Sequence, residues 1–338
     1  MKKKVIRSLC GFAEYSDSAR ILGELAIVGT KLTERGYEIQ TRRICFVATP
    51  ITWLKNGVGA EDVYLSVGTL DRNTALRQLD EFLCSDNISL NLDLTTGVDS
   101  DDVEPLLRII REKPSKTFQF AFTFNNRPSS PFFPSATFER AGFAIGLQST
   151  DLAEHCDNLA MWLSGMREVW NELCEILDVH RSFLGIDSSV APLFKGGSSL
   201  VNFLKRTYGS FSRAVTTDTF LTLSRFLVTH NPKPVGLCGL MLPCLEDFEL
   251  ADEYEAGQFS IERNLFLSLH SGLGVDTYPI GIDENPRRIF DILRLVHGLS
   301  AKYSKPLSVR FVSDGKAQIG DVTDFRNRYL KDVTIRPL

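Results

Sequence analysis

The chain has 338 residues, of which 43% are hydrophobic and 24% charged, enough apolar residues for one large α/β domain or two smaller ones. Its formal net charge of -4 and pI near 5.8 exclude a dedicated nucleic-acid binder, which would be basic with clustered lysine and arginine. No window approaches the ~18 to 20 consecutive apolar residues of a membrane span, so we expect a cytoplasmic protein without membrane contact.

Strand-like apolar runs alternate with helix-like stretches along the whole chain. The first half predicts strands over residues 5–12, 41–49, 88–94 and 118–124, and helices over residues 16–35, 75–85, 102–112 and 150–179. The second half predicts strands over 186–190, 235–242 and 307–312, and helices near residue 198, over 218–229, 245–257 and 260–268, and from Pro286. This alternation is typical of a mostly parallel sheet under helices, in a barrel or a doubly wound fold. Because no linker interrupts it, we expect a single domain over residues 1–338, with a C-terminal tail from about residue 313.

Four segments at predicted strand ends carry polar groups that a core disfavours. They are ATPITW (48–53), GIDSSVAP (185–192), GLCGLMLPCLEDFELA (236–251) and GLGVDTYPIG (272–281). In parallel α/β folds, ligands bind where the loops that follow the strands converge. We therefore expect four catalytic carboxylates in one pocket, from Asp187, Glu246, Asp247 and Asp276. The alternative is that each aspartate caps the helix or turn behind it, and for Asp247 both interpretations are equally favoured.

Asp187 and Asp276 share a local pattern. Each follows a short apolar run that contains a glycine, and each is followed by hydroxyl side chains and then proline. Two uncompensated buried carboxylates must be paired, protonated or bound to a ligand. We therefore expect these two carboxyl groups to face one pocket.

Six further residues are expected to contact the ligand: Thr49, Phe132, Phe133, Ser198, Ser199 and His270. The two phenylalanines lie in a proline-rich loop, 127–138, that would wall a pocket or equally pack on the core or a subunit interface. The two serines precede a helix in FKGGSSLVNFLKR, where backbone amides suit an anion, although an ordinary serine cap has the same pattern. His270 is the histidine nearest a candidate segment, and its ordinary role would be at the surface or in the core.

Several of these segments occur together in one known family. TPITW, SPFFPSATF followed by GFAIGLQSTDLAEH, GIDSSVAP, GLMLPCLEDFELA and GVDTYP appear in the order found in the domain-of-unknown-function 711 family, which the chain resembles from its first strand to about Val312. The resemblance implies a closed ten-stranded α/β barrel of the pyruvate formate-lyase type, related also to anaerobic ribonucleotide reductase, and a homodimer. It implies no established reaction. Many relatives carry a histidine where this chain has Phe138, which implies a different substrate or a weaker activity if that histidine matters.

The enzymes that share this barrel use a glycyl radical and a cysteine on a loop inside it. This chain has no RVxG followed by an aromatic residue near its C-terminus. Its seven cysteines are dispersed without a CxxC pair, and we interpret Cys238 and Cys244 as buried and inert. We therefore expect non-radical chemistry without a glycyl radical.

The preferred hypothesis is an enzyme that acts on a small polar, sugar-like ligand in the barrel mouth. Clustered carboxylates fit a hydrolase, including one that cleaves a glycosidic bond, and Mg²⁺ or Ca²⁺ is the candidate metal. The alternative is a non-catalytic dimer that binds or senses a metabolite, because carboxylates that accept hydrogen bonds from sugar hydroxyls have the same sequence pattern.

Overall fold

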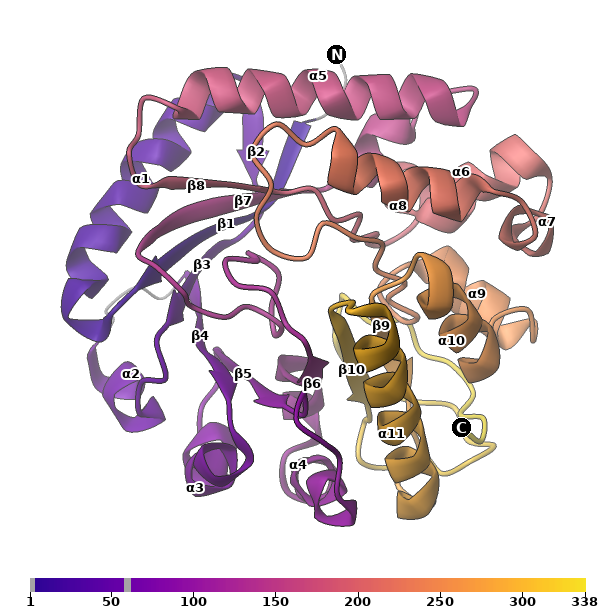
Figure 1. Ribbon diagram of the computed structural model, residues 1–338. Helices are drawn as coiled ribbons and strands as arrows, with labels where there is room; N and C mark the ends of the chain where they lie inside the picture. Colours follow the sequence, from indigo (N-terminus) through magenta and orange to yellow (C-terminus); the bar gives the residue numbers. More distant parts are fainter. Residues whose placement is uncertain (1–3, 58–61) are drawn as a thin grey trace.

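The computed structural model describes residues 4–57 and 62–338. It is an α/β fold in which helices surround a mixed ten-stranded sheet (Figure 1). The strands are β1 (Lys4–Ala13), β2 (Tyr37–Ile39), β3 (Arg42–Phe46), β4 (Val63–Leu70), β5 (Ile88–Asp93), β6 (Phe120–Phe124), β7 (Gly142–Leu147), β8 (Phe183–Asp187), β9 (Gly274–Pro279) and β10 (Leu307–Val312). Their order is β8-β7-β1-β3-β4-β5-β6-β10-β9, with β2 paired to β1 off this path.

The sheet consists of two sets of strands that run in opposite directions. Strands β1, β3, β4, β5 and β6 are parallel to one another. β7 pairs antiparallel with β1, and β10 pairs antiparallel with β6, while β8 and β9 follow β7 and β10 in parallel. Seven of the nine pairings between the described strands are parallel and two are antiparallel, so the mostly parallel sheet expected from the sequence is confirmed.

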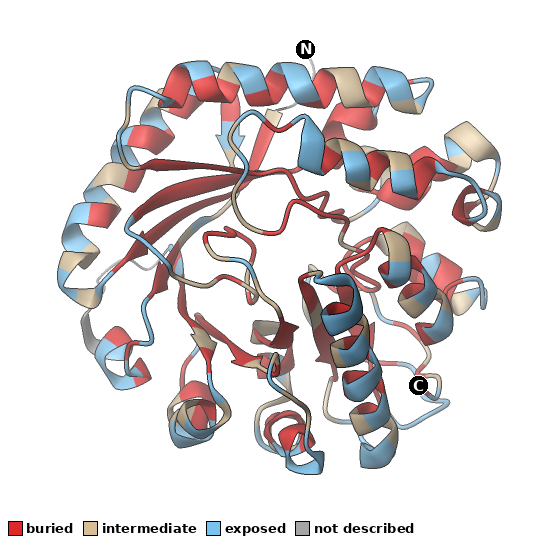
Figure 2. Cartoon of the chain, viewed as in Figure 1, coloured by how far each residue is buried: buried red, intermediate tan, exposed pale blue. Residues whose placement is uncertain are grey.

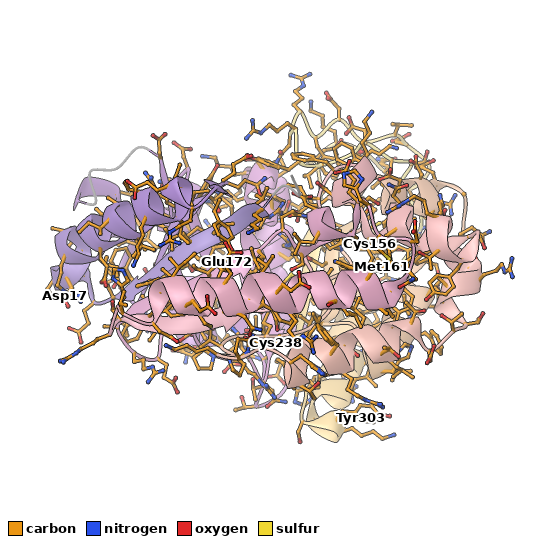
Figure 3. The ribbon with its side chains drawn as sticks, turned by 90° about the horizontal axis from the view of Figure 1, so that it is seen from above. Asp17, Cys156, Met161, Glu172, Cys238 and Tyr303 are labelled. Atoms are coloured by element: carbon orange, nitrogen blue, oxygen red, sulfur yellow. The ribbon has the colours of Figure 1, made fainter. Side chains whose placement is uncertain are left out.

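The helices pack their apolar stripes against the sheet and expose their polar faces (Figure 2). They are α1 (Ser18–Glu34), α2 (Ile51–Gly57), α3 (Arg72–Leu83), α4 (Glu104–Glu112), α5 (Leu159–Leu177), α6 (Leu200–Tyr208), α7 (Phe211–Val215), α8 (Thr219–Thr229), α9 (Phe248–Glu255), α10 (Ile261–His270) and α11 (Pro286–Tyr303). Helix α5 lies lengthwise across the molecule in Figure 3, and its Glu172 pairs with Lys4 of β1 at 2.5 Å. Among the described residues, no helix has the length and apolar character needed to cross a membrane.

Two predicted elements differ from those observed. The segment 235–242 is not a strand, because Gly236 and Cys238 have φ of 71° and 46° and break the extended conformation. The helix expected over 150–179 begins only at Leu159, where the Asn158 side chain caps it, and a 3₁₀ turn precedes it. The sequence also predicts no strand at β4 or β7, and the two glycines of β7 weaken its strand pattern.

The segment 234–243 nevertheless lies between the two ends of the sheet. Pro234 and Leu240 form isolated bridges to Ile186 of β8 and to Val190 just beyond it. On the other side, Leu240 bridges Gly272 and Pro243 bridges Asp276 of β9. An irregular connection therefore joins the two end strands where a regular strand is missing.

The proline-rich loop 127–138 fills the interior of the sheet. Figure 1 shows it curled between the strands, and the Ser8 hydroxyl of β1 donates to the Pro131 carbonyl at 2.7 Å. Phe132 is buried, and Phe133 and Phe138 pack with Cys10 and Cys45 on the inner face of the strands. The expected placements were a pocket wall, the core or a subunit interface, and the interior position agrees with the first two and not with an exposed interface.

Gly146 makes room for this loop, and its substitution tests the arrangement. A Cβ at Gly146 would lie 2.5 Å from the Phe132 ring. We expect Gly146→Ala to lower the free energy of unfolding by about 1–3 kcal/mol, because the ring must shift within a packed interior. Urea denaturation measures this. Gly23→Ala is the matched control, since its Cβ would meet nothing within 4 Å on an exposed helix face, and it should be neutral or stabilising.

Candidate functional site

A cavity of about 340 Å³ lies inside the sheet. Its walls come from the amino-terminal ends of β3, β4 and β5, whose second residues are Arg43, Tyr64 and Ser89, and from the loop 127–138 and the middle of β9 and β10. The sequence-based expectation of a site beyond the carboxyl ends of the strands is wrong for β3, β4 and β5. That rule applies to parallel sheets, whereas here two sets of strands that run in opposite directions both line the cavity.

Arg7 enters the cavity from a β-bulge. The register between β1 and β7 shifts between Ile6 and Ser8, so Arg7 is an extra residue on β1. Such a bulge interrupts strict alternation and redirects a side chain, which is a common device beside functional sites. The Arg7 guanidinium donates to Gln148 Oε1 at 3.4 Å and to Glu246 Oε2 at 2.9 Å.

A second irregularity brings Asp276 and Arg310 together. The register between β9 and β10 shifts so that Asp276 and Thr277 lie opposite Arg310 alone. Thr277 has a φ of 38°, which is strained for a β-branched residue. Arg310 donates from Nε to Asp276 Oδ1 at 2.7 Å and from Nη2 to Glu246 Oε1 at 2.6 Å.

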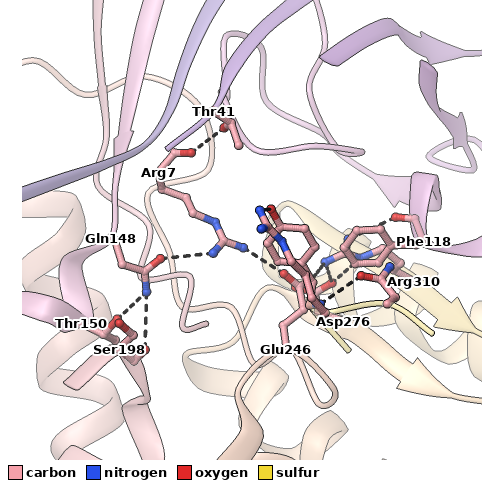
Figure 4. A network of polar contacts seen from close by, with 12 residues as sticks. Arg7, Thr41, Phe118, Gln148, Thr150, Ser198, Glu246, Asp276 and Arg310 are labelled. Carbon is pink, nitrogen blue, oxygen red and sulfur yellow. Dashed lines mark hydrogen bonds and ion pairs between the residues drawn. The ribbon is translucent and has the colours of Figure 1, made fainter. Parts of the chain in front are cut away.

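Glu246 joins the two irregular regions into one ionic network, drawn in Figure 4. Its two oxygens bind different arginines, Arg7 and Arg310, and Arg310 also binds Asp276. Burial lowers the pKa of Arg7. Burial acts in the same direction on Arg310, but the opposing effect of Asp276 and Glu246 is larger, so its pKa is raised. The two guanidinium and two carboxylate groups balance, as charges withdrawn from water must.

Arg43 is a cationic residue of the cavity that forms no ion pair with the carboxylates of this network. Its Nε donates to Thr41 Oγ1 at 3.1 Å, and the guanidinium lies 5.1 Å from the Phe133 ring centroid. Among residues 4–57 and 62–338, no carboxylate forms an ion pair with it. Burial, reinforced by the charge of Arg7, lowers its pKa to about 10. The cavity therefore holds one guanidinium without a protein anion.

The residues predicted as functional separate into two groups. Glu246, Asp276, Phe132 and Phe133 line the cavity. Six others do not: Asp187, Asp247, Thr49, Ser198, Ser199 and His270. The structure therefore brings two of the four expected carboxylates together and keeps the other two apart.

Asp187 is buried away from the cavity and holds two loops together. Its carboxylate accepts hydrogen bonds from the Ser130 and Ser189 hydroxyls at 2.7 and 2.5 Å and from the backbone amides of Ser189, Leu237 and Cys238 at 3.0 Å each. A Cβ at Gly236 would lie 2.4 Å from its Oδ2. The expectation that Asp187 and Asp276 face one pocket is therefore wrong, because backbone amides, and not a ligand, satisfy Asp187.

Asp247 adopts the capping role that was its alternative interpretation. It accepts from the Leu250 amide of α9 and from the Leu200 amide of α6, at 3.4 and 3.0 Å. Burial raises its pKa to about 7, although hydrogen bonds oppose the shift. Ser199 similarly caps α6 through the Asn202 amide at 3.0 Å.

The three remaining predicted contacts have partners within the protein and away from the cavity. The Ser198 hydroxyl donates to Asp151, and the Thr49 hydroxyl donates to the Val47 carbonyl at 2.5 Å. His270 Nδ1 lies 2.6 Å from Ser271 Oγ, and burial lowers the pKa of His270.

The sequence analysis did not identify the cationic residues of the cavity. These are Arg7, Arg43, Lys113, Lys116 and Arg310, and Lys113 pairs with Asp86 of the same cavity wall at 3.3 Å. Two of them carried a usable signal, because Arg7 and Arg310 lie inside predicted core strands where an unpaired charge is costly. In the part of the chain that the structure describes, no three His, Cys, Asp or Glu side chains are grouped to hold a metal ion.

Asp187→Asn tests the structural role of Asp187. An asparagine offers an NH₂ group where the carboxylate accepts from backbone amides. We expect a loss of about 1–3 kcal/mol in the free energy of unfolding, measured by chemical denaturation. Equal stability of Asp187→Asn and the wild type would contradict this role.

Comparison with protein-family models identifies a family for this chain. No curated protein matches the chain. The family model described as Uncharacterised ACR (DUF711) matches residues 73–327, which include β5 to β10 and the two carboxylates of the ionic network, Glu246 and Asp276. The chain therefore belongs to the uncharacterised DUF711 family.

Proposed function

We propose that this protein is an enzyme that binds a small anionic metabolite in the cavity, with the anionic group on Arg43. The observation that carries the proposal is the unbalanced guanidinium of Arg43. Its Nε is held by Thr41, which leaves the two terminal nitrogens for a ligand. A planar guanidinium with both of these nitrogens available matches a carboxylate or a phosphate.

The rest of the cavity suits a polar molecule of modest size. About 340 Å³ is within the range of small-molecule sites, and Phe118, Phe132 and Tyr329 supply apolar wall. Gln40 also lines the cavity, and its buried Oε1 has no hydrogen-bond partner among the described residues. A ligand hydroxyl or amine would satisfy this acceptor. Together these groups favour an acid that also carries hydroxyl or amino groups, which includes sugar acids.

In this proposal Glu246 and Asp276 position the arginines of the cavity and do not act as free catalytic carboxylates. Each lies 2.6 Å from the same Arg310 nitrogen, so both carboxylates are already engaged with a cation of the protein. We propose that they hold Arg7 and Arg310 in place and accept hydrogen bonds from the ligand. Hydrolysis of a glycosidic bond is also a candidate reaction, and it requires one carboxyl group that gives a proton to the leaving group.

Non-catalytic metabolite binding is the second candidate function. It is favoured by the complete pairing of the network, which leaves neither carboxylate without a cation. Turnover distinguishes the two candidates. If Glu246→Gln and Asp276→Asn abolish turnover of a bound acid but weaken its binding little, the enzyme is supported.

Removal of the Arg43 charge tests the anion site. We expect inorganic phosphate and gluconate to bind the wild type, and Arg43→Gln to bind both about 10- to 100-fold more weakly, because charge-assisted hydrogen bonds are lost. Isothermal titration calorimetry measures the dissociation constants. Arg77→Gln is the control of equal charge change, on the exposed face of α3. Equal affinity of Arg43→Gln and the wild type would refute the proposed site.

The strands at the two ends of the sheet, β8 and β9, lie on either side of the segment 234–243. We propose that the sheet closes into the pyruvate formate-lyase type of barrel, supported by the bridges that 234–243 makes to β8 and β9.

We also propose a cytoplasmic homodimer. This proposal rests on the family resemblance alone, because the phenylalanine-rich loop lies inside the protein and is not an exposed surface for a second subunit. Light scattering should give a particle of twice 37.9 kDa, and a particle of 37.9 kDa at micromolar concentration would contradict the dimer.

A further inference from the structure

A second pocket adjoins the cavity at the amino-terminal ends of β3 and β4. It has a volume of about 490 Å³, and we call it the outer pocket. Four residues line both the cavity and the outer pocket: Gln40, Thr41, Tyr64 and Tyr329. The two spaces therefore meet at these side chains, and a ligand in either space lies against residues of the other.

Arg43 lies directly beside this border. It pairs with Tyr64 in the parallel register of β3 and β4, so the two side chains leave backbones about 4.8 Å apart on the same face of the sheet. The Arg43 Nε also donates to Thr41 Oγ1 at 3.1 Å. Two of the four shared residues are therefore immediate neighbours of the guanidinium that the proposed function assigns to the anion.

Arg328 brings a second guanidinium to the border from the side of the outer pocket. Its Nη2 donates to the hydroxyl of Tyr329, and the guanidinium lies 4.7 Å from the Tyr329 ring centroid. The hydrogen bond with Tyr329 and, to a smaller extent, the nearby Tyr64 raise the pKa of Arg328. Burial lowers the pKa of Arg43, and Tyr64 opposes this decrease. Tyr64 therefore lies near both guanidinium groups.

The outer pocket carries one positive charge in excess. Its charged lining residues are Arg42, Asp62 and Arg328, and the charges of the first two formally offset each other. Within the described part of the chain, no carboxylate pairs with Arg328, and its only hydrogen-bond acceptor is the Tyr329 hydroxyl. The remaining N–H groups of this guanidinium are available to a ligand.

The chain around Arg328 is anchored, although the side chain itself is exposed. The Tyr329 ring stacks on Phe194 with centroids 5.7 Å apart. The Lys331 amide donates to the Leu245 carbonyl at 3.0 Å. The guanidinium is therefore presented from a fixed turn, which reduces the entropy lost when a ligand group is held there.

We propose that the ligand carries a second acidic group, a carboxylate or a phosphate, which binds Arg328 in the outer pocket while the first binds Arg43. This inference rests on the proposed function, since Arg43 holds the first acidic group. It adds the substrate class, a hydroxy acid with a second anionic group at the far end of its chain. A guanidinium matches both kinds of anion.

Calorimetric titration of the full chain with three acids that share one carbon chain tests the inference. Gluconate has one acidic group, glucarate has a second carboxylate at the far end, and 6-phosphogluconate has a phosphate there. We expect at least one of the two diacids to bind the wild type about fivefold more tightly than gluconate, the upper range for an ion pair that stays exposed to water. A gain with glucarate assigns a carboxylate to the outer pocket, and a gain with 6-phosphogluconate alone assigns a phosphate.

Arg328→Gln should remove this gain, so that the diacid and gluconate bind with about equal affinity. Arg326→Gln is the matched control of equal charge change on the same turn. Arg326 is exposed, pairs with Asp324 at 2.9 Å, and lines neither the cavity nor the outer pocket. This control should retain the gain at constant ionic strength, because an effect of overall charge would reduce it in both variants alike.

The outcomes separate this inference from the proposed function. Equal affinities of the wild type for gluconate and both diacids would overturn the second acidic group, whereas gluconate binding that depends on Arg43 would still support the anion site. An equal loss of the gain in Arg326→Gln and Arg328→Gln would overturn the role of Arg328. Unchanged diacid affinity in Arg43→Gln would show that one ligand does not span both arginines. If gluconate does not bind and Arg43→Gln does not change phosphate affinity, the proposed function itself fails.

Discussion

The ion pairs that Glu246 forms with Arg7 and Arg310 are the interaction on which the site depends. They connect β1, β10 and the segment after Pro243, which are remote in sequence. Removing one member of a buried ion pair typically costs about 3–5 kcal/mol, because a charge then stays buried without a partner. The network therefore fixes the shape of the cavity and engages Glu246 and Asp276, while Asp86 pairs with Lys113, which leaves Arg43 without an anion from the described residues.

Much of the fold could be predicted from the sequence, because strand-helix alternation reflects burial directly. The strand at Leu307–Val312 and the helix from Pro286 have clear apolar patterns and coincide with β10 and α11. The segment 235–242 is equally apolar but irregular, because positive φ angles at Gly236 and Cys238 do not show in hydrophobicity. The reversal of four strands could not be predicted, since direction depends on pairing between distant segments.

The candidate site could be predicted only in part, because contacts between distant segments decide which polar residues reach the cavity. Asp276, Glu246 and Asp187 all interrupt apolar segments in the same way. Asp276 and Glu246 line the cavity, whereas Asp187 does not. The difference lies in amide donors 50 and 51 residues away, at Leu237 and Cys238, which local sequence cannot reveal. Arginines at bulged or register-shifted positions depart from strict alternation, so a period of two does not place them in the interior.

A crystal structure of the protein soaked with gluconate tests the central claim most directly. The account predicts carboxylate density within hydrogen-bond distance of the terminal nitrogens of Arg43, a ligand hydroxyl donating to Gln40 Oε1, and an intact network of Glu246 with Arg7 and Arg310. Gluconate bound elsewhere with the cavity empty, or an Arg43 side chain paired with a carboxylate of the protein, would contradict it.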